Sequence, residues 1–285
     1  MSQLSEMQVQ PFGGLLRHWR RQRGWSQLEL ACQSEVSQRH ISFLESGRSQ
    51  PSRAMVLHLA TVLAVPLRQQ NVMLSGAGFA PVYSEHDLSA PELAPIQQAI
   101  AAMLHQQDPY PALVMDRYWT LLQANQGAQT LMAWLLGNRI SYFEQPLNMM
   151  RLMLHPQGLR PYVDDWETIA GSLVQRLQHE AQAEGVDSPT VQLLRSLEAD
   201  LPAPAAASLP FSSALPVLPI TFVKANQHLS FFTIISTLGT PRDITLQELR
   251  IESLFPADAA TARLMQQFHK DSLEHPPEQD GRFVT

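Results

Sequence analysis

The fold of the N-terminal part of the chain is decided by one stretch, SQLELACQSEVSQRHISFLESGRSQPS (residues 26–52). Ser26 and Glu29 stand three positions apart and form a capping box, in which the two side chains satisfy backbone N–H groups at the start of a helix. Ser37 can cap the next helix, which ends at Gly47. The stretch therefore predicts two short helices joined by a tight turn.

The apolar residues of this stretch have the spacing of two crossing helices. Ala31 supplies the small residue that a close crossing needs, and Val36, Ile41 and Leu44 supply core contacts. The turn position carries Glu35, and a non-glycine residue in the left-handed conformation costs roughly 1–2 kcal/mol. We expect the turn to adjust and the helix pair to form.

Helical signals continue on both sides of the stretch. Before it, an Arg-rich amphipathic helix follows Pro11. After it, Ser52 can cap a fourth helix, and a fifth spans about residues 67–75. Two glycines and a proline in SGAGFAP (75–81) then mark a boundary. We expect an all-α domain over residues 1–80.

Charge is distributed unevenly along the chain. The net charge is −6, but residues 1–80 carry eight Arg against four Glu, and the remaining 205 residues carry twelve basic and 22 acidic side chains. Binding to nucleic acid depends on local charge, because phosphate contacts and counterion release occur at one face. The acidic total therefore does not argue against a DNA-binding N-terminal domain.

Several classes of protein and site are disfavoured by the composition. No run of about eighteen apolar residues is present to cross a membrane, and the N-terminus lacks a secretory signal, so we expect a cytoplasmic protein. The single cysteine, Cys32, can form neither an internal disulfide nor a cysteine-based metal site. We expect Cys32 to be a small core residue.

The stretch 26–52, with its surroundings, resembles the Cro/repressor-like (XRE) helix-turn-helix family over about 70 residues. The resemblance implies that the third helix enters the major groove of duplex DNA and presents its first residues to base edges. Glutamine can pair with adenine, arginine with guanine, and an aromatic ring can contact thymine methyl groups. The residues expected to contact bases are Ser37, Gln38, Arg39, Ser42 and Phe43, and those expected to contact phosphates are Gln27, Arg48 and Ser49.

Beyond residue 80 the pattern changes to mixed α and β. We expect a linker over 81–104 with a helix over 91–106, and then a β-hairpin formed by Ala112–Met115 and Trp119–Ala124. Helices follow to about residue 201, the segment 201–210 is expected to be a loop, and 269–285 a disordered tail. Three antiparallel strands are expected at Pro219–Val223, Leu229–Leu238 and Ile244–Leu254.

Three segments of this second domain (109–132, 148–166 and 232–258) resemble the ligand-binding domain of MmyB-like transcription regulators. The resemblance implies an α+β, PAS-like fold over 105–268, with an antiparallel sheet and a cavity for a fatty-acid-like molecule. The candidate ligand-binding residues are Trp134, Phe143, Met149, Met153, Phe222 and Phe232, all of which could equally be ordinary core. The carboxylate of such a ligand would need a cationic partner, for which the candidates are Arg151, Arg160 and Arg176.

We therefore expect a DNA-binding transcriptional regulator, acting as a homodimer, whose second domain senses a small apolar ligand. No catalytic motif, required cofactor, metal site or membrane partner is indicated; a bound fatty acid is the one small molecule expected. One alternative is a second domain that serves dimerisation or protein interaction and binds no ligand. Another is an enzyme fused to a DNA-binding module. An apolar cavity would favour the sensor, a large exposed apolar patch the interaction module, and titratable groups clustered in a cleft the enzyme.

Overall fold

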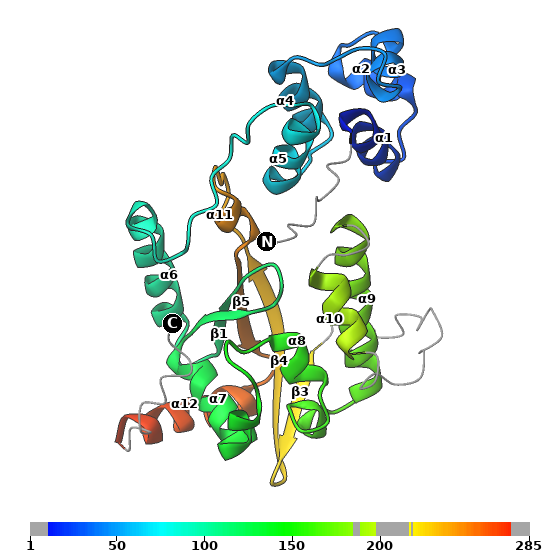
Figure 1. The fold of residues 1–285 in the computed structure, drawn as a ribbon. Helices are drawn as coiled ribbons and strands as arrows, with labels where there is room; N and C mark the ends of the chain where they lie inside the picture. The colour runs from blue at the N-terminus through cyan, green and yellow to red at the C-terminus, as the bar shows by residue number, and fades with distance from the viewer. Residues whose placement is uncertain (1–10, 185–188, 198–216, 218, 275–285) are drawn as a thin grey trace, which may run out of the picture. The chain divides into compact units, whose positions relative to one another are not determined.

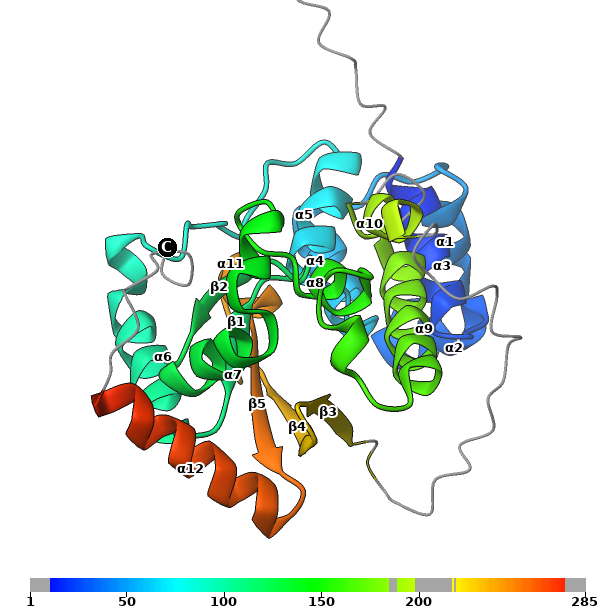
Figure 2. The same cartoon turned by 90° about the horizontal axis from the view of Figure 1, so that it is seen from below.

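The computed structural model describes residues 11–184, 189–197, 217 and 219–274 (Figure 1). The chain forms two compact units. We define the first unit as residues 1–90 with 238–247, and the second unit as residues 91–237 with 248–285. Figure 2 labels the helices and strands of both units. Residues 81–90, predicted from sequence as part of a linker, and residues 238–247, predicted as part of the second domain, both belong to the first unit.

The described part of the first unit is helical, as expected. The capping box is present, since Ser26 Oγ accepts from Glu29 N at 3.1 Å and Ser26 N donates to Glu29 Oε2 at 2.6 Å. Ser37 caps the third helix as predicted, and Glu35 takes the left-handed conformation with φ of 54°. The helices are α1 (Phe12–Gln22), α2 (Gln27–Ser34), α3 (Gln38–Glu45), α4 (Arg53–Val62), α5 (Leu67–Gly76) and most of α11 (Ile244–Glu248).

The core of the first unit lies among α1 to α5 and contains the apolar residues that the helix spacing indicated. Ile41 and Leu44 are buried, and Val36 packs against the cluster. Cys32 is a correction, because its side chain is exposed. The buried residues of α2 are Leu30, Ala31 and Ser34, and an advance of about 100° per residue turns Cys32 away from that face.

A close approach between α1 and α3 fixes their packing. A Cβ atom added at Gly13 would lie 2.5 Å from the carbonyl oxygen of Leu44 and 2.8 Å from that of Glu45. No larger residue fits there without moving a backbone. The glycine therefore lets α1 press against the end of α3.

The second unit contains a five-stranded sheet in the order β2-β1-β5-β4-β3, in which every neighbouring pair is antiparallel. The predicted hairpin is confirmed, as are two of the three later strands with small changes at their ends. The strands are β1 (Ala112–Met115), β2 (Leu121–Ala124), β3 (Ile220–Lys224), β4 (Gln227–Ser236) and β5 (Arg250–Pro256). The α+β, PAS-like class expected for this domain is the class observed.

The strand predicted at Ile244–Leu254 is wrong in its first half. Residues 244–248 form the short helix α11, and β5 begins only at Arg250. Asp243 accounts for the difference, because its Oδ1 atom accepts from the backbone N–H groups of Thr245 at 2.9 Å and Leu246 at 3.4 Å. An aspartate that binds these N–H groups caps a helix start and opposes an extended strand.

Helices α6, α7 and α12 pack against the sheet of the second unit, and α9 packs against α10. Helix α12 continues to Glu274, beyond the predicted end at Phe268, while 275–285 and the predicted loop 201–210 lie outside the described residues. Within the described ranges, none of the helices combines the length and apolarity needed to cross a membrane. The helices are α6 (Ala94–Gln107), α7 (Gln126–Leu136), α8 (Met149–Leu154), α9 (Trp166–Glu184), α10 (Pro189–Leu197) and α12 (Ala259–Glu274), with short 3-10 helices at Pro91–Leu93, Gly137–Tyr142 and Arg160–Tyr162.

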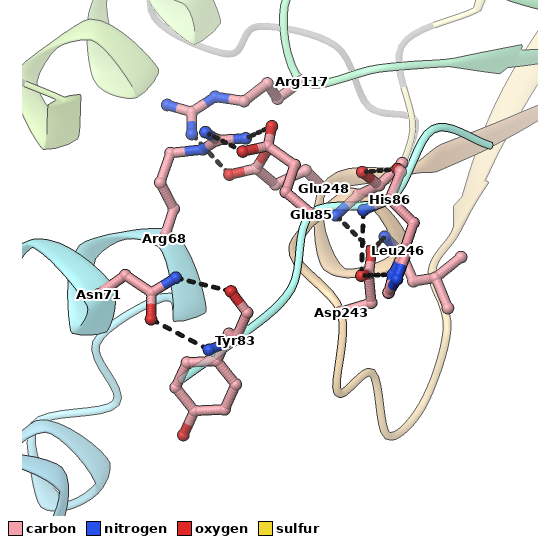
Figure 3. Close-up of polar contacts among 10 residues, drawn as sticks. Arg68, Asn71, Tyr83, Glu85, His86, Arg117, Asp243, Leu246 and Glu248 are labelled. Atoms are coloured by element: carbon pink, nitrogen blue, oxygen red, sulfur yellow. Dashed lines mark hydrogen bonds and ion pairs between the residues drawn. The ribbon is translucent and has the colours of Figure 1, made fainter. Parts of the chain in front are cut away.

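Polar side chains link residues 82–86 to α5 and Asp243 to His86 within the first unit (Figure 3). The amide of Asn71 on α5 binds the backbone of Tyr83 at 2.8 and 3.1 Å. It also accepts from the backbone N–H of Val82 at 2.9 Å. The Oδ2 atom of Asp243 lies 2.8 Å from Nδ1 of His86 and accepts from the His86 backbone N–H at 3.2 Å. These contacts explain why a segment between two strands of the second unit belongs to the first.

The same segment also reaches α5 directly. The side-chain oxygen of Gln247 accepts from the backbone N–H of Leu67, at the start of α5, at 2.7 Å. Thr245 Oγ1 donates to the carbonyl oxygen of His86 at 2.6 Å, and Ile244 N donates to that of Ser84 at 2.9 Å. Residues 243–247 of the connection between β4 and β5 are therefore hydrogen-bonded to the start of α5 and to residues 84–86.

Candidate functional site

The start of α3 presents polar side chains to solvent. Ser37, Gln38 and Arg39 are exposed, whereas Ser42 and Phe43 are half-buried. The guanidinium of Arg39 lies 5.3 Å from the centre of the Phe43 ring, within the range of a cation–π contact. The residues predicted to contact bases therefore lie on α3 or cap its start, and the guanidinium of Arg39 lies beside the ring of Phe43.

The loop after α3 folds back on the helix. The backbone N–H groups of Arg48 and Ser49 donate to the carbonyl oxygen of Phe43 at 2.9 and 3.3 Å. Arg48 is exposed and Ser49 half-buried. Both residues, predicted to contact phosphate, thus lie directly beyond the end of α3.

Gln27 is engaged inside the first unit. Its side-chain Nε2 donates to Glu45 Oε2 at 2.9 Å, and the side chain is half-buried. Gln27 is the first residue of α2, where backbone N–H groups lack partners within the helix. A phosphate contact at this position would therefore use the backbone more readily than the side chain.

A buried ion pair holds α3 against α1. Glu45, whose side chain is 1% exposed, accepts from Arg20 Nε at 2.6 Å and from Arg20 Nη2 at 3.0 Å. Burial by itself would raise the pKa of the Glu45 carboxyl, but hydrogen bonds from Arg20 and Gln27 and the charges of Arg20 and Arg17 outweigh burial and lower it. The end of α3 is thus fixed by charge-assisted bonds that sequence reasoning did not identify.

The second unit contains an apolar cavity with a volume of about 90 Å³. Side chains from α7, α8, α9 and from the sheet surround it. The lining residues are Pro111, Leu113, Trp119, Ala128, Leu131, Met132, Leu135, Met149, Met150, Met153, Leu159, Leu173, Arg176, Ile220, Phe222, Thr233, Glu252 and Leu254. Such a lining suits an aliphatic ligand.

Three of the lining residues carry polar side chains, namely Arg176, Thr233 and Glu252. Loss of hydration lowers the pKa of the Arg176 guanidinium and raises that of the Glu252 carboxyl from their ordinary values. The charges of Arg176 and Arg250 and a hydrogen bond with Thr233 oppose the rise at Glu252 only in part. These groups give an otherwise apolar cavity one polar end.

The predicted ligand-binding residues are divided between the cavity and other positions. Met149, Met153 and Phe222 line the cavity. Trp134 packs on Phe268 with ring centres 5.4 Å apart. Phe143 meets His155 edge-on at 5.4 Å, and Phe232 stacks on Phe255 at 5.6 Å.

Of the three arginines predicted as carboxylate partners, Arg176 lines the cavity. Arg151 donates to Ser196 Oγ at 3.1 Å. Arg160 lies 5.1 Å from the centre of the Trp166 ring.

Sequence reasoning missed Thr233 and Glu252. In the sheet register, Thr233 pairs with Leu254, and Glu252 lies two residues before Leu254 on β5, so the three share one face. Polar residues on the core face of apolar strands were the signal that could have identified them.

The described residues contain no group of three or more His, Cys, Asp or Glu side chains placed to hold a metal ion.

Comparisons with known proteins match two parts of the chain to families. Residues 96–268 match the family described as the MmyB-like transcription regulator ligand binding domain, and residues 11–71 match a helix-turn-helix domain. A comparison with curated proteins found no match. A solved structure described as an RNA-binding Light-Oxygen-Voltage receptor shows 13% identity and a TM-score of 0.26, with 93% of this chain and 63% of that chain covered. The chain thus spans less than two thirds of that structure, and so low a TM-score supports no conclusion.

Proposed function

The chain belongs to the MmyB-like transcription regulators, and on that premise we propose that it senses an apolar carboxylic acid and changes its affinity for operator DNA in response. Both matched families are domains of transcription regulators and not enzymes. The observation that carries the proposal is the apolar cavity with one polar end in the second unit.

A fatty-acid-like ligand suits this cavity for two reasons. Each buried methylene contributes about 0.8 kcal/mol, so an aliphatic chain among the methionines and leucines can bind tightly without a covalent bond. A carboxylate needs a partner when it leaves water, and Arg176 offers a guanidinium at the cavity wall. The six residues predicted earlier remain our candidates, with Met149, Met153 and Phe222 best placed for contact.

Mass spectrometry of a denatured extract of the purified protein tests this function. One aliphatic acid should be recovered in about equal amount to the protein. The matched control is Ala128→Leu, which adds three carbons to a small residue in the cavity wall and should release the acid. An extract without any apolar molecule would favour the alternative, in which the second domain serves dimerisation or protein interaction.

For the first unit, we propose that Ser37, Gln38, Arg39, Ser42 and Phe43 read bases, and that Gln27, Arg48 and Ser49 contact phosphates. Arg39→Ala should cost about 1–3 kcal/mol and relax the preference at one operator position, because a bidentate contact to guanine is lost. Arg48→Ala should weaken binding to all sequences alike and reduce the salt dependence. Titration of operator variants at several salt concentrations separates the two effects. Equal losses on every sequence from both substitutions would contradict the assignment.

We further propose that the protein binds DNA as a homodimer, since one small helix-turn-helix unit contacts too little surface for high specificity. Half-sites should lie about one helical turn apart, roughly 34–36 Å. We place the dimer contact in the second unit, which contains more residues than the first. Sedimentation of the protein with operator DNA measures this directly. A monomer on a single half-site, at concentrations that saturate the operator, would rule out the dimer.

We propose that ligand and DNA communicate through residues 238–247. Thr233 on β4 and Glu252 on β5 line the cavity, and the segment between these strands belongs to the first unit. Its anchor is Asp243, which binds His86 and caps α11 (Figure 3). A ligand that shifts β4 against β5 would therefore displace a segment bonded to the start of α5.

A further inference from the structure

Arg176 and Glu252 line the polar end of the cavity, and two further charged side chains, Glu180 and Arg250, lie next to them. The Glu180 carboxylate on α9 lies 3.0 Å from Nη1 of Arg250 and 3.5 Å from Nε of Arg176. Its second oxygen accepts from Trp119 Nε1 at 3.0 Å. The negative charge of Glu180 is thus already balanced by two arginines and a hydrogen bond from the Trp119 indole.

Glu252 is the second carboxyl group at this end, and it lines the cavity. The groups that face it are Arg176 from α9, Arg250 from its own strand and the Thr233 hydroxyl from β4. With both glutamates ionised, the cluster of two arginines and two glutamates is electrically neutral. A carboxylate that enters beside Arg176 would then add an unbalanced negative charge in a place where burial already disfavours an ionised Glu252.

Two carboxyl groups that lie side by side, here Glu252 and the ligand's carboxylate, repel each other when both are ionised. One proton shared between them removes this repulsion. We propose that Glu252 is a specificity-determining residue of this cavity, which takes one proton from solvent when an aliphatic carboxylate binds beside Arg176 and donates it in a hydrogen bond to that carboxylate. The inference rests on the proposed function, since it requires the cavity to bind an apolar acid.

The sign of the pH dependence follows from this linkage. The carboxylate raises the pKa of Glu252 in the complex above that in the free protein, where burial already raises it. The affinity for the carboxylate is therefore highest below the pKa that Glu252 has in the free protein. Above that pKa, the affinity falls about tenfold per pH unit until the pH reaches the pKa that Glu252 has in the complex. A ligand with a neutral hydroxyl head takes up no proton, so its affinity does not change.

Titration calorimetry of the delipidated full-length protein with decanoate and with 1-decanol tests the inference. Experiments between pH 6 and 8, in buffers of different ionisation enthalpy, count the protons taken up. We expect uptake approaching one proton per decanoate and none per decanol. Glu252→Gln keeps a hydrogen-bond donor without a charge, so decanoate should bind it without proton uptake. At pH 8 it should bind decanoate at least tenfold more tightly than the native protein does.

The outcomes separate this inference from the function on which it rests. If decanoate binds the native protein without proton uptake, or if the Glu252→Gln variant keeps the native pH dependence, the role of Glu252 is refuted and the sensor function stands. Tighter binding of decylammonium than of decanoate would show an ionised Glu252 that selects cations, and would also refute it. If none of these compounds binds, both the sensor function and the role of Glu252 are wrong.

Discussion

Replacing Glu45 by alanine should lower the free energy of unfolding of the first unit by about 3–5 kcal/mol, the range found when one partner of a buried ion pair is removed. The Arg20 guanidinium, which donates twice to Glu45, would then be left with Trp25 O as its remaining acceptor. Hydrogen exchange of the α1 and α3 amides in the full-length protein measures the effect. Operator affinity should fall with it, because α3 ends at Glu45.

The pH dependence of the same interaction has a definite sign. The folded-state pKa of Glu45 is lowered, so the pair stabilises the first unit fully above the carboxyl pKa of the unfolded chain, about 4.3. That stability is lost as the pH falls through the lower, folded-state pKa. The Glu45→Ala variant should therefore lose less stability on acidification than the native protein.

A double variant, Arg20→Met with Glu45→Leu, is the matched control. Replacing both partners of a buried pair with apolar residues of similar volume is often nearly neutral, because no unpaired charge remains. The double variant should therefore be far more stable than Glu45→Ala. Equal destabilisation of the two variants would mean that the loss comes from packing and not from the stranded arginine.

Local signals explain why the first unit could be predicted closely from sequence. The capping serines and the spacing of Ala31, Ile41 and Leu44 act within a few residues of the helices they define. Cys32 was misplaced because a small apolar side chain carries little information about which helix face it occupies. The Arg20–Glu45 pair joins residues 25 positions apart, and nothing in the local pattern of either residue indicated the other.

The cavity of the second unit could be predicted as a kind of site but not residue by residue. On α7, Ala128, Leu131, Met132 and Leu135 face the cavity with helical spacing, whereas Trp134 lies off that stripe. The sequence prediction selected large or polarisable apolar side chains as ligand contacts, and that choice favours Trp134 over its smaller neighbours on α7. The face of a helix that meets a cavity is set by the whole packing of the unit.

The attachment of residues 238–247 to the first unit was also beyond local reasoning. The pairing of Asp243 with His86 joins residues 157 positions apart, and the residues after Asp243 were predicted to form a strand from Ile244. Only the folded chain shows that the connection between two cavity-lining strands is bonded to the helical unit. We therefore expect ligand binding and operator binding to be coupled through residues 238–247.

Asp243→Asn should therefore abolish most of the coupling between ligand and operator, while leaving each binding site intact. Asparagine keeps an oxygen for the N–H groups that cap α11 but replaces the carboxylate oxygen that faces His86 with a donor. If ligand changes operator affinity by a factor within the usual range of about 5–150, the factor in this variant should approach one. The measurement is operator affinity with and without decanoate, and decanoate affinity with and without operator, which must change by the same factor.

Two further variants separate coupling from binding. Asp87→Asn removes a nearby carboxylate that is exposed and bonds to Ser89, and it should keep the native coupling. Ala128→Leu should lose decanoate binding and keep the operator affinity of the ligand-free protein, because it changes the cavity alone. Full coupling in Asp243→Asn, with native affinities at both sites, would show that the signal bypasses residues 238–247. Loss of operator binding without ligand would instead show that Asp243 supports the fold of the first unit, since a residue that only transmits the signal leaves ligand-free affinity unchanged.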